Sequence, residues 1–252
     1  MRRSPSRRAS AAAGNRERLQ VSSEPPMKFR LFVKRHPPVG ARPGTLVIEQ
    51  NGQFPDIRVI DYTADKVQEH EHVAVADLAG CIASGATTWI DVRGLADEAT
   101  LRGIADILKI HPLALEDVVN VPQRPKSEVY EAHHLIVLRM AMGEGEHPST
   151  EQVSVLIGRN YVATFQERDG DCLNPVRERI RQGRGPIRTA GAGYLGYALI
   201  DALIDGYFPV LERFGEHLAA VEDEVVEAPT RGTLRDIHAV RRTLMGLRRA
   251  LW

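Results

Sequence analysis

The sequence predicts an α/β protein of the α+β type. We expect a mixed, largely antiparallel sheet flanked by helices, an αβα sandwich, followed by long C-terminal helices that form the start of a stalk. Up to about residue 185, short β-rich runs alternate with amphipathic helical runs, and turn residues alone separate several of the β-rich runs. From about residue 186 onward the β-rich runs stop, and apolar residues recur at intervals of three and four.

The 252 residues exceed one average domain and divide by composition into four parts. Residues 1–40 are basic and contain few large apolar side chains, which predicts a disordered tail; an organelle transit peptide is the alternative. Residues 41–185 form the αβα domain. Residues 186–229 form a long helix packing on that domain, and residues 230–252 form the start of the stalk helix.

The first strands are expected as a hairpin. Residues 44–50 and 56–62 are rich in β-formers, and the turn sequence NGQFP lies between them. Thr63 is a good N-cap for a short helix, TADKVQEHEH, and a second helix follows in AVADLAGCIASG. Residues 87–94, TTWIDVRG, are predicted to form the next strand.

The middle of the chain continues this alternation. The spacing of apolar residues predicts an amphipathic helix over 96–110, and LALEDVV predicts a short helix within 111–128. A long strand is expected over 128–142, and two strands joined at 158–160 within 150–167. A helix begins at Asn174-Pro175, with proline at its first position.

The C-terminal part predicts two helices packed as an antiparallel hairpin. An apolar seam runs from Ile200 to Val225, and a second from Leu234 to Leu251. Gly206 and Pro209 predict a kink in the first helix, which ends before Pro229. Acidic residues gather at the end of the first helix and arginines along the second, so opposite charge favours their packing.

Composition excludes several classes of protein. Lys plus Arg equals Asp plus Glu at 33 each, so the net charge gives no reason to expect a nucleic-acid partner. Two cysteines without CxxC spacing indicate a reducing compartment. The sequence contains no run of 18 apolar residues, the length needed to span a bilayer. It also has no phosphate-binding glycine loop and no nucleophile elbow, so we predict that the protein is not an enzyme.

Two places in the sequence are candidates for metal binding. Glu116 and Asp117 are adjacent on a short helix and point about 100° apart, so they cannot clasp one ion as a pair or face each other as an acid/base pair. Solvated side chains and a weak, water-mediated magnesium site both stay open. Asp201 lies among apolar neighbours, where a carboxylate is costly unless it is paired or exposed at an edge.

Several runs occur in an order that points to one family. They are HPLALEDVVNVPQRPKSE, HLIVLRM, EQVSVLIGRNYVATFQE, NPVRERIRQGRGPIR, YLGYALIDALIDGYFPVLE and RRTLMGLRRALW. Together they resemble the cytoplasmic domain of CorA-type magnesium and cobalt transport proteins, over roughly residues 40–252.

The resemblance implies a homopentamer in the cell inner membrane, with this segment on the cytoplasmic side. It also implies that divalent cations bind between neighbouring cytoplasmic domains and keep the pore closed when intracellular magnesium is high. By motif match, Asp117, Glu116 and Asp201 are metal-binding residues, with magnesium as a weak regulatory ligand and cobalt or another divalent ion as alternatives. Their partner aspartate would come from the stalk helix of an adjacent subunit, beyond residue 252.

The sequence has neither a Gly-Met-Asn motif nor a transmembrane run. The resemblance therefore implies a regulatory domain truncated before the transmembrane helices, with the pore absent and the membrane reached through a missing C-terminal part. Two alternatives stay open: a zinc transporter of the ZntB type, and a stand-alone soluble module for metal sensing or protein interaction.

Overall fold

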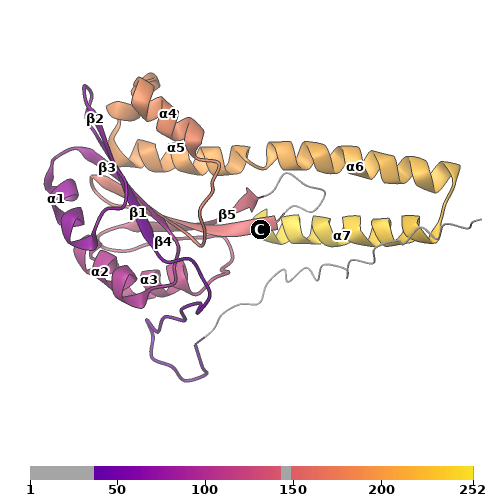
Figure 1. Cartoon of the computed structure of the whole chain (residues 1–252), viewed down its shortest axis with the longest axis horizontal. Helices are drawn as coiled ribbons and strands as arrows, with labels where there is room; N and C mark the ends of the chain where they lie inside the picture. Colours follow the sequence, from indigo (N-terminus) through magenta and orange to yellow (C-terminus); the bar gives the residue numbers. More distant parts are fainter. Residues whose placement is uncertain (1–36, 143–148, 252) are drawn as a thin grey trace, which may run out of the picture. The chain divides into compact units, whose positions relative to one another are not determined.

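A seven-stranded mixed sheet forms the centre of the fold, in the order β2-β1-β3-β7-β6-β5-β4. The computed structural model describes residues 37–142 and 149–251 (Figure 1). Most of the predicted tail and the predicted turn at 143–148 lie outside the described residues. The strands are β1 (Asp56–Tyr62), β2 (Val67–His70), β3 (Thr87–Arg93), β4 (Lys126–Val129), β5 (His134–Met142), β6 (Ser149–Ile157) and β7 (Tyr161–Gln166).

Pairing within the sheet is antiparallel except between β3 and β7, the one parallel pair among the described strands. This pair joins two antiparallel groups: β1, β2 and β3 on one side, and β4 to β7 on the other. Both strands of the parallel pair are buried throughout apart from Thr87, as expected for strands covered on both faces.

One helical layer covers the first face of the sheet. It contains η1 (Val75–Asp77), α1 (Leu78–Ala83), α2 (Glu98–Leu108) and α3 (Pro112–Val119). The Asp97 carboxylate caps α2 by accepting a hydrogen bond from the Thr100 amide at 2.8 Å. The shared core under this layer includes Leu78, Leu101, Ile104, Leu115 and Val118, packed against Ile57, Ile90, Val92 and Leu135.

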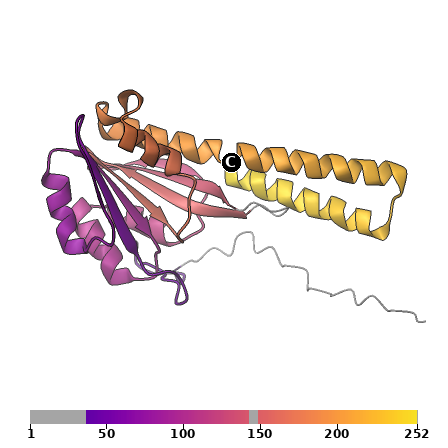
Figure 2. The ribbon, with the colours of Figure 1, turned by 45° about the horizontal axis from the view of Figure 1, so that its top comes forward.

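The second layer covers the opposite face with α4 (Asn174–Gln182), η2 (Gly185–Arg188) and α5 (Gly191–Asp205). Its core includes Val176, Ile180, Leu195, Leu199 and Leu203, packed against Tyr62, Trp89, Met140, Val155 and Val162. Figure 2 shows the sheet lying between the two helical layers. The αβα architecture predicted from the sequence is therefore confirmed.

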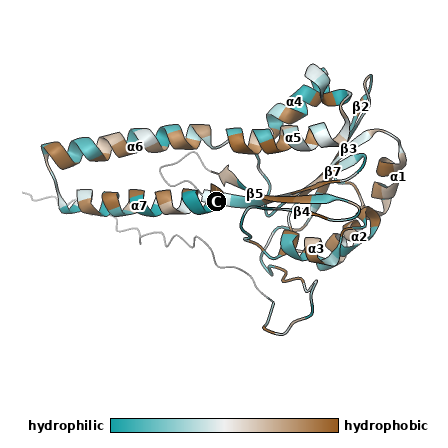
Figure 3. Ribbon diagram, turned by 180° about the vertical axis from the view of Figure 1, so that it is seen from behind, coloured by the Kyte–Doolittle hydropathy of each residue, from teal (hydrophilic) through white to brown (hydrophobic). Residues whose placement is uncertain are grey.

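Two long helices follow, α6 (Phe208–Glu227) and α7 (Arg231–Leu251), which contact each other as the predicted hairpin. The break between α5 and α6 falls at Gly206-Tyr207, where the kink was predicted. Only part of the predicted seam is buried: Val210, Phe214 and Val221 on α6, with Val240 and Leu247 on α7. The predicted seam residues Leu234, Ile237, Leu244 and Leu251 are exposed. In Figure 3 hydrophobic and hydrophilic residues alternate along both helices.

Two predictions near the N-terminus are wrong. Residues 44–50 form no strand, because side chains of α3 and of Asn120, which follows it, take up their backbone groups. The Asn120 amide side chain accepts from the Val47 amide at 2.8 Å and donates to the Thr45 carbonyl at 3.1 Å. Residues 67–70, predicted within a helix, form β2 instead. A turn in which Thr63 bonds Lys66 through both backbone and hydroxyl folds β2 back onto β1.

The predicted strand over 128–142 is also interrupted. A tight turn closed by the Tyr130 amide and the His133 carbonyl, 2.8 Å apart, separates β4 from β5. The two strands pair with each other as a hairpin, and β4 becomes the edge of the sheet.

A buried ionic cluster joins α4 to the sheet. Arg177 of α4 donates to Asp91 of β3 at 2.8 Å and makes two 2.7 Å bonds to Asp171. Arg93 donates to the same oxygen of Asp91 at 2.9 Å. Burial alone raises the pKa of Asp171, but the bonds and charge of Arg177 outweigh it and lower that pKa to about 2. The Arg177 guanidinium also lies 4.9 Å from the centre of the Trp89 ring.

Replacing Arg177 with alanine is expected to lower the free energy of unfolding by roughly 3–5 kcal/mol, because the change removes the cation that makes two hydrogen bonds to buried Asp171 and one to buried Asp91. Arg181→Ala on the same helix is the matched control, since its bonds to Glu69 and Glu178 are exposed. The control is expected to lose less than about 1 kcal/mol. Urea denaturation followed by circular dichroism measures both, and equal losses would contradict the role given to the cluster.

Candidate functional site

The candidate site is built on α3, whose start is fixed by two residues. The His111 side chain caps the helix by accepting from the Leu113 amide at 3.3 Å, and Pro112 occupies the first helical position. Ala114, Leu115, Val118 and Val119 are buried against the sheet, which leaves Glu116 and Asp117 partly exposed on the other side of the helix. The short helix predicted in this segment is confirmed.

Glu116 and Asp117 reach in different directions, as the helix geometry predicted. Glu116 accepts a hydrogen bond from the Gly44 amide at 2.6 Å and so holds the 44–50 segment against α3. The Asp117 carboxylate lies 2.5 Å from the ammonium of Lys126 on β4. The two carboxylates therefore cannot bind the same cation together.

Lys126 links Asp117 to a second carboxylate. Its ammonium also donates to Glu128 at 2.9 Å, and the Tyr130 hydroxyl donates to the other oxygen of Glu128 at 2.8 Å. Burial alone lowers the pKa of Lys126, but the bonds to the two carboxylates outweigh it and the pKa is raised. The bonds from Lys126 and then Tyr130 lower the pKa of Glu128. The sequence drew attention to Asp117, but Lys126 and Glu128 were missed.

Asp201 lies apart from the other two predicted residues. It is half-buried on α5, which packs on the opposite face of the sheet from α3. The structure thus places Asp117 and Asp201 in different layers, and any single ion bound by Asp117 needs its remaining ligands from elsewhere. Throughout residues 37–142 and 149–251, no three His, Cys, Asp or Glu side chains gather in a way that could hold a metal ion.

The donors at Asp117, Glu116 and Glu128 nevertheless suit a hard cation. Carboxylate oxygens are the ligands that magnesium prefers, and magnesium keeps several waters while binding one or two carboxylates. A softer ion would be expected among thiolate or imidazole ligands. The chemistry of α3 and β4 therefore fits a partly hydrated divalent cation.

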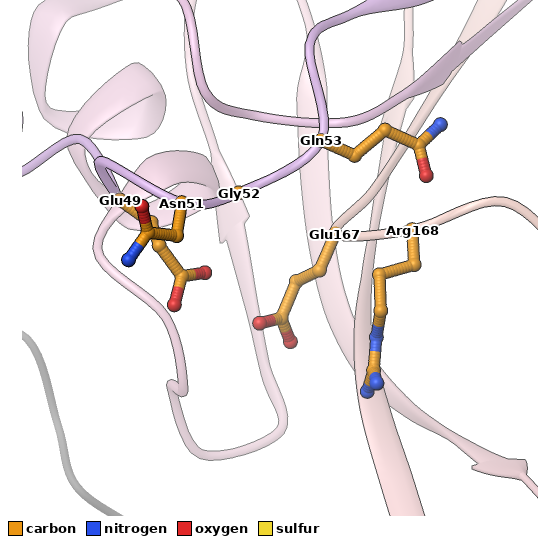
Figure 4. A pocket seen from close by; sticks show the side chains of 6 residues that line it. All are labelled: Glu49, Asn51, Gly52, Gln53, Glu167 and Arg168. Atoms are coloured by element: carbon orange, nitrogen blue, oxygen red, sulfur yellow. The ribbon is translucent and has the colours of Figure 1, made fainter.

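A polar pocket of about 630 Å³ opens beside the carboxyl end of β7. Its lining residues are Glu49, Asn51, Gly52, Gln53, Glu167 and Arg168 (Figure 4). Gln53 ties the 49–53 segment to the end of β7 by accepting from the Asp169 amide at 2.9 Å. Nothing in the sequence pattern predicted this pocket, because its walls come from segments more than a hundred residues apart.

Glu151 on β6 is fully buried next to this end of β7. One carboxyl oxygen accepts from the Arg168 amide at 2.8 Å. The other has no hydrogen-bond partner in the part of the chain that the structure describes, and the exposed Arg168 side chain approaches it at 3.6 Å. Burial raises the pKa of Glu151 to about 7, and the charge of Glu167 adds to the rise.

Comparison with known proteins identifies the family. The model of the family described as CorA-like Mg²⁺ transporter protein matches residues 84–252. The chain belongs to the CorA-like Mg²⁺ transporter family. This is a family of transporters rather than enzymes, and the match includes α3 with Glu116 and Asp117.

Two curated relatives share extensive sequence with the chain. It is 39% identical over 218 residues to the cobalt/magnesium transport protein CorA of Thermotoga maritima, covering 84% of this chain and 62% of that protein. It is 32% identical over 164 residues to the putative metal ion transporter YfjQ of Bacillus subtilis, covering 65% of this chain and 50% of that protein. The chain thus spans less than two thirds of the length of either relative.

Solved structures share the CorA fold at lower sequence identity. The soluble domain of CorA from Methanocaldococcus jannaschii matches with a TM-score of 0.59 and 18% identity, covering 82% of this chain and 76% of that chain. The ZntB cytoplasmic domain from Vibrio parahaemolyticus matches with a TM-score of 0.57 and 14% identity, covering 77% and 73%. Among the helices within the described ranges, none has both the length and the apolar content needed to cross a membrane.

Glu151→Gln is expected to stabilise the protein at pH 8 by roughly 2–3 kcal/mol relative to the wild type. The raised pKa means that the folded protein holds a proton on Glu151 more tightly than the unfolded chain does. Wild-type stability from this group therefore falls as the pH rises from 4.5 to about 7, whereas glutamine stays neutral. Urea denaturation at pH 5, 6, 7 and 8 measures the difference, which should shrink toward pH 5.

Glu131→Gln, in the exposed turn between β4 and β5, is the matched control for that series. It should shift stability by less than about 0.5 kcal/mol at every pH. A gap between Glu151→Gln and wild type that stays constant from pH 5 to pH 8 would show that proton binding at Glu151 is not its cause.

Proposed function

We propose that the chain is the cytoplasmic regulatory part of a magnesium/cobalt transporter in the cell inner membrane. In this proposal it senses intracellular magnesium at the interfaces between subunits of a homopentamer and so gates a pore formed by another part of the protein. The observation that carries the proposal is the 39% identity to a cobalt/magnesium transport protein over 84% of the chain. The family match, which includes α3, supports it.

The geometry of α3 supports sensing between subunits rather than within one chain. Glu116 and Asp117 diverge, one toward Gly44 and the other toward Lys126, and Asp201 lies in the other helical layer. A cation held by Asp117 with most of its waters is bound weakly until a neighbouring subunit adds a carboxylate. Weak binding suits a sensor, because occupancy then changes over the range of free magnesium concentrations it has to report.

Asp117→Ala, in a longer protein that contains this chain and its membrane part, is expected to weaken protection of the cytoplasmic region by magnesium. We expect the magnesium concentration that gives half-maximal protection from trypsin to rise about tenfold, since one of few charged ligands is lost. Uptake of ions should also become less inhibited by internal magnesium. Limited proteolysis and uptake of magnesium, cobalt and zinc measure the two effects.

Asp106→Ala provides the matched control, because Asp106 is an exposed aspartate on α2 in the same helical layer. The control should keep the wild-type dependence on magnesium. If Asp117→Ala and Asp106→Ala give the same protection curve as the wild type, Asp117 is not part of a magnesium sensor.

A further inference from the structure

Two carboxylates converge on one positive charge beside α3. The Lys126 ammonium lies 2.5 Å from Asp117 and 2.9 Å from Glu128. The three side chains keep between 18% and 39% of their surface exposed, so water and dissolved ions can reach them. One oxygen of Asp117 and one of Glu128 thus face a common point, and the Lys126 ammonium occupies that point.

The local structure explains this convergence. Lys126 and Glu128 are two residues apart on β4, so their side chains leave the same face of the strand. Asp117 comes from α3, held in place by its own carbonyl, which accepts from Gln152 of β6 at 2.9 Å. The Tyr130 hydroxyl fixes the second oxygen of Glu128 and leaves the first directed at Lys126.

We infer that Lys126 is a tethered competitor for the divalent cation at Asp117, and that Glu128 is a further ligand of that cation. The inference rests on the proposed function and adds to it the residue that sets the affinity of the site. A single ammonium leaves the pair of carboxylates with one uncompensated negative charge, whereas a divalent cation neutralises both. The lysine can yield its place because its flexible stem lets the ammonium move out into water.

This arrangement makes cation binding an exchange. The cation enters and the ammonium leaves, so every binding event includes the cost of breaking two charged hydrogen bonds. The affinity of the site is therefore lower than the two carboxylates alone would give. It also means that cation binding breaks the bridge that Lys126 of β4 makes to Asp117 of α3.

The test measures binding of Mn²⁺, a paramagnetic substitute for Mg²⁺, to the 252-residue chain by NMR line broadening of backbone amides. Removing the ammonium in Lys126→Met is expected to tighten binding at Asp117 about tenfold. This is the size of effect expected for a partly exposed charge pair, which is larger than for a fully exposed pair and smaller than for a buried one. Lys126→Gln, which keeps a polar end, should act in the same direction. Lys126→Arg keeps the charge and should bind no more tightly than the wild type.

Two further variants test the ligands. Glu128→Gln is expected to weaken binding about tenfold in the Lys126→Met background, and Asp117→Asn in that background should abolish the broadening. Lys66→Met, at the exposed turn beyond β1 on the far side of the sheet, controls for loss of a positive charge and should leave binding unchanged.

The outcomes separate this inference from the proposed function. Broadening centred on Asp117 with equal affinity in wild type, Lys126→Met and Lys126→Gln would overturn the competitor role and leave the sensor intact. Unchanged affinity in Glu128→Gln would overturn its role as a ligand. An absence of broadening around Asp117 in every folded variant would overturn the inference that Asp117 and Glu128 bind a cation within one chain. It would leave the proposed function, which needs a neighbouring subunit, to the protection assay on the longer protein.

Discussion

The fold depends on the ionic cluster in which Arg177 meets Asp91 and Asp171 under α4. The cluster lies where the two antiparallel halves of the sheet join through their single described parallel pair. Asp91 on β3 accepts hydrogen bonds from Thr164 and Gln166 on β7, so one carboxylate connects both strands to the helix above them. Buried charges are costly unless every oxygen has a partner, and here they have several. The same satisfied network fixes the sheet against which α3 packs on the other face.

Much of the architecture could be predicted from the sequence because it follows from periodicity. The helices around Leu101, Leu115 and Ile180 each bury one apolar stripe, and the break at Gly206 follows from local chemistry. Strand partners could not be predicted in the same way. Residues 44–50 have the composition of a strand, yet Asn120 and Glu116, more than seventy positions away, bind their backbone groups instead. Hydrogen bonds from side chains so far away in the sequence cannot be predicted from local sequence patterns.

In the candidate site, too, some residues could be predicted from the sequence and others could not. Glu116 and Asp117 stand out in the sequence, and helix geometry correctly predicted that they diverge. Lys126 and Glu128 could not be connected to them from the sequence. Residues 128–142 were predicted as one long strand, whereas a turn at 130–133 separates β4 from β5 and places β4 at the edge of the sheet. Glu151 gives no signal at all in the sequence, since an isolated glutamate in a strand is ordinarily exposed. The seam on α7 was predicted about one position off. The buried stripe includes Thr233, Thr243 and Ala250, whereas the larger apolar neighbours Leu234, Leu244 and Leu251 are exposed.

The junction between α5 and α6 has a mechanical consequence. The helix breaks at Gly206, and the next residue anchors the sheet, since the Tyr207 hydroxyl donates to the Arg139 carbonyl at 2.8 Å. Leu247 of α7 packs at the same place against Tyr207 and Val210. Beyond this anchor α6 continues for 20 residues, about 30 Å. A rotation of about ten degrees at the break would thus move the turn at the far end by about 5 Å. Because of this length, a small change of angle at the Tyr207 anchor would become a larger displacement at the turn between α6 and α7.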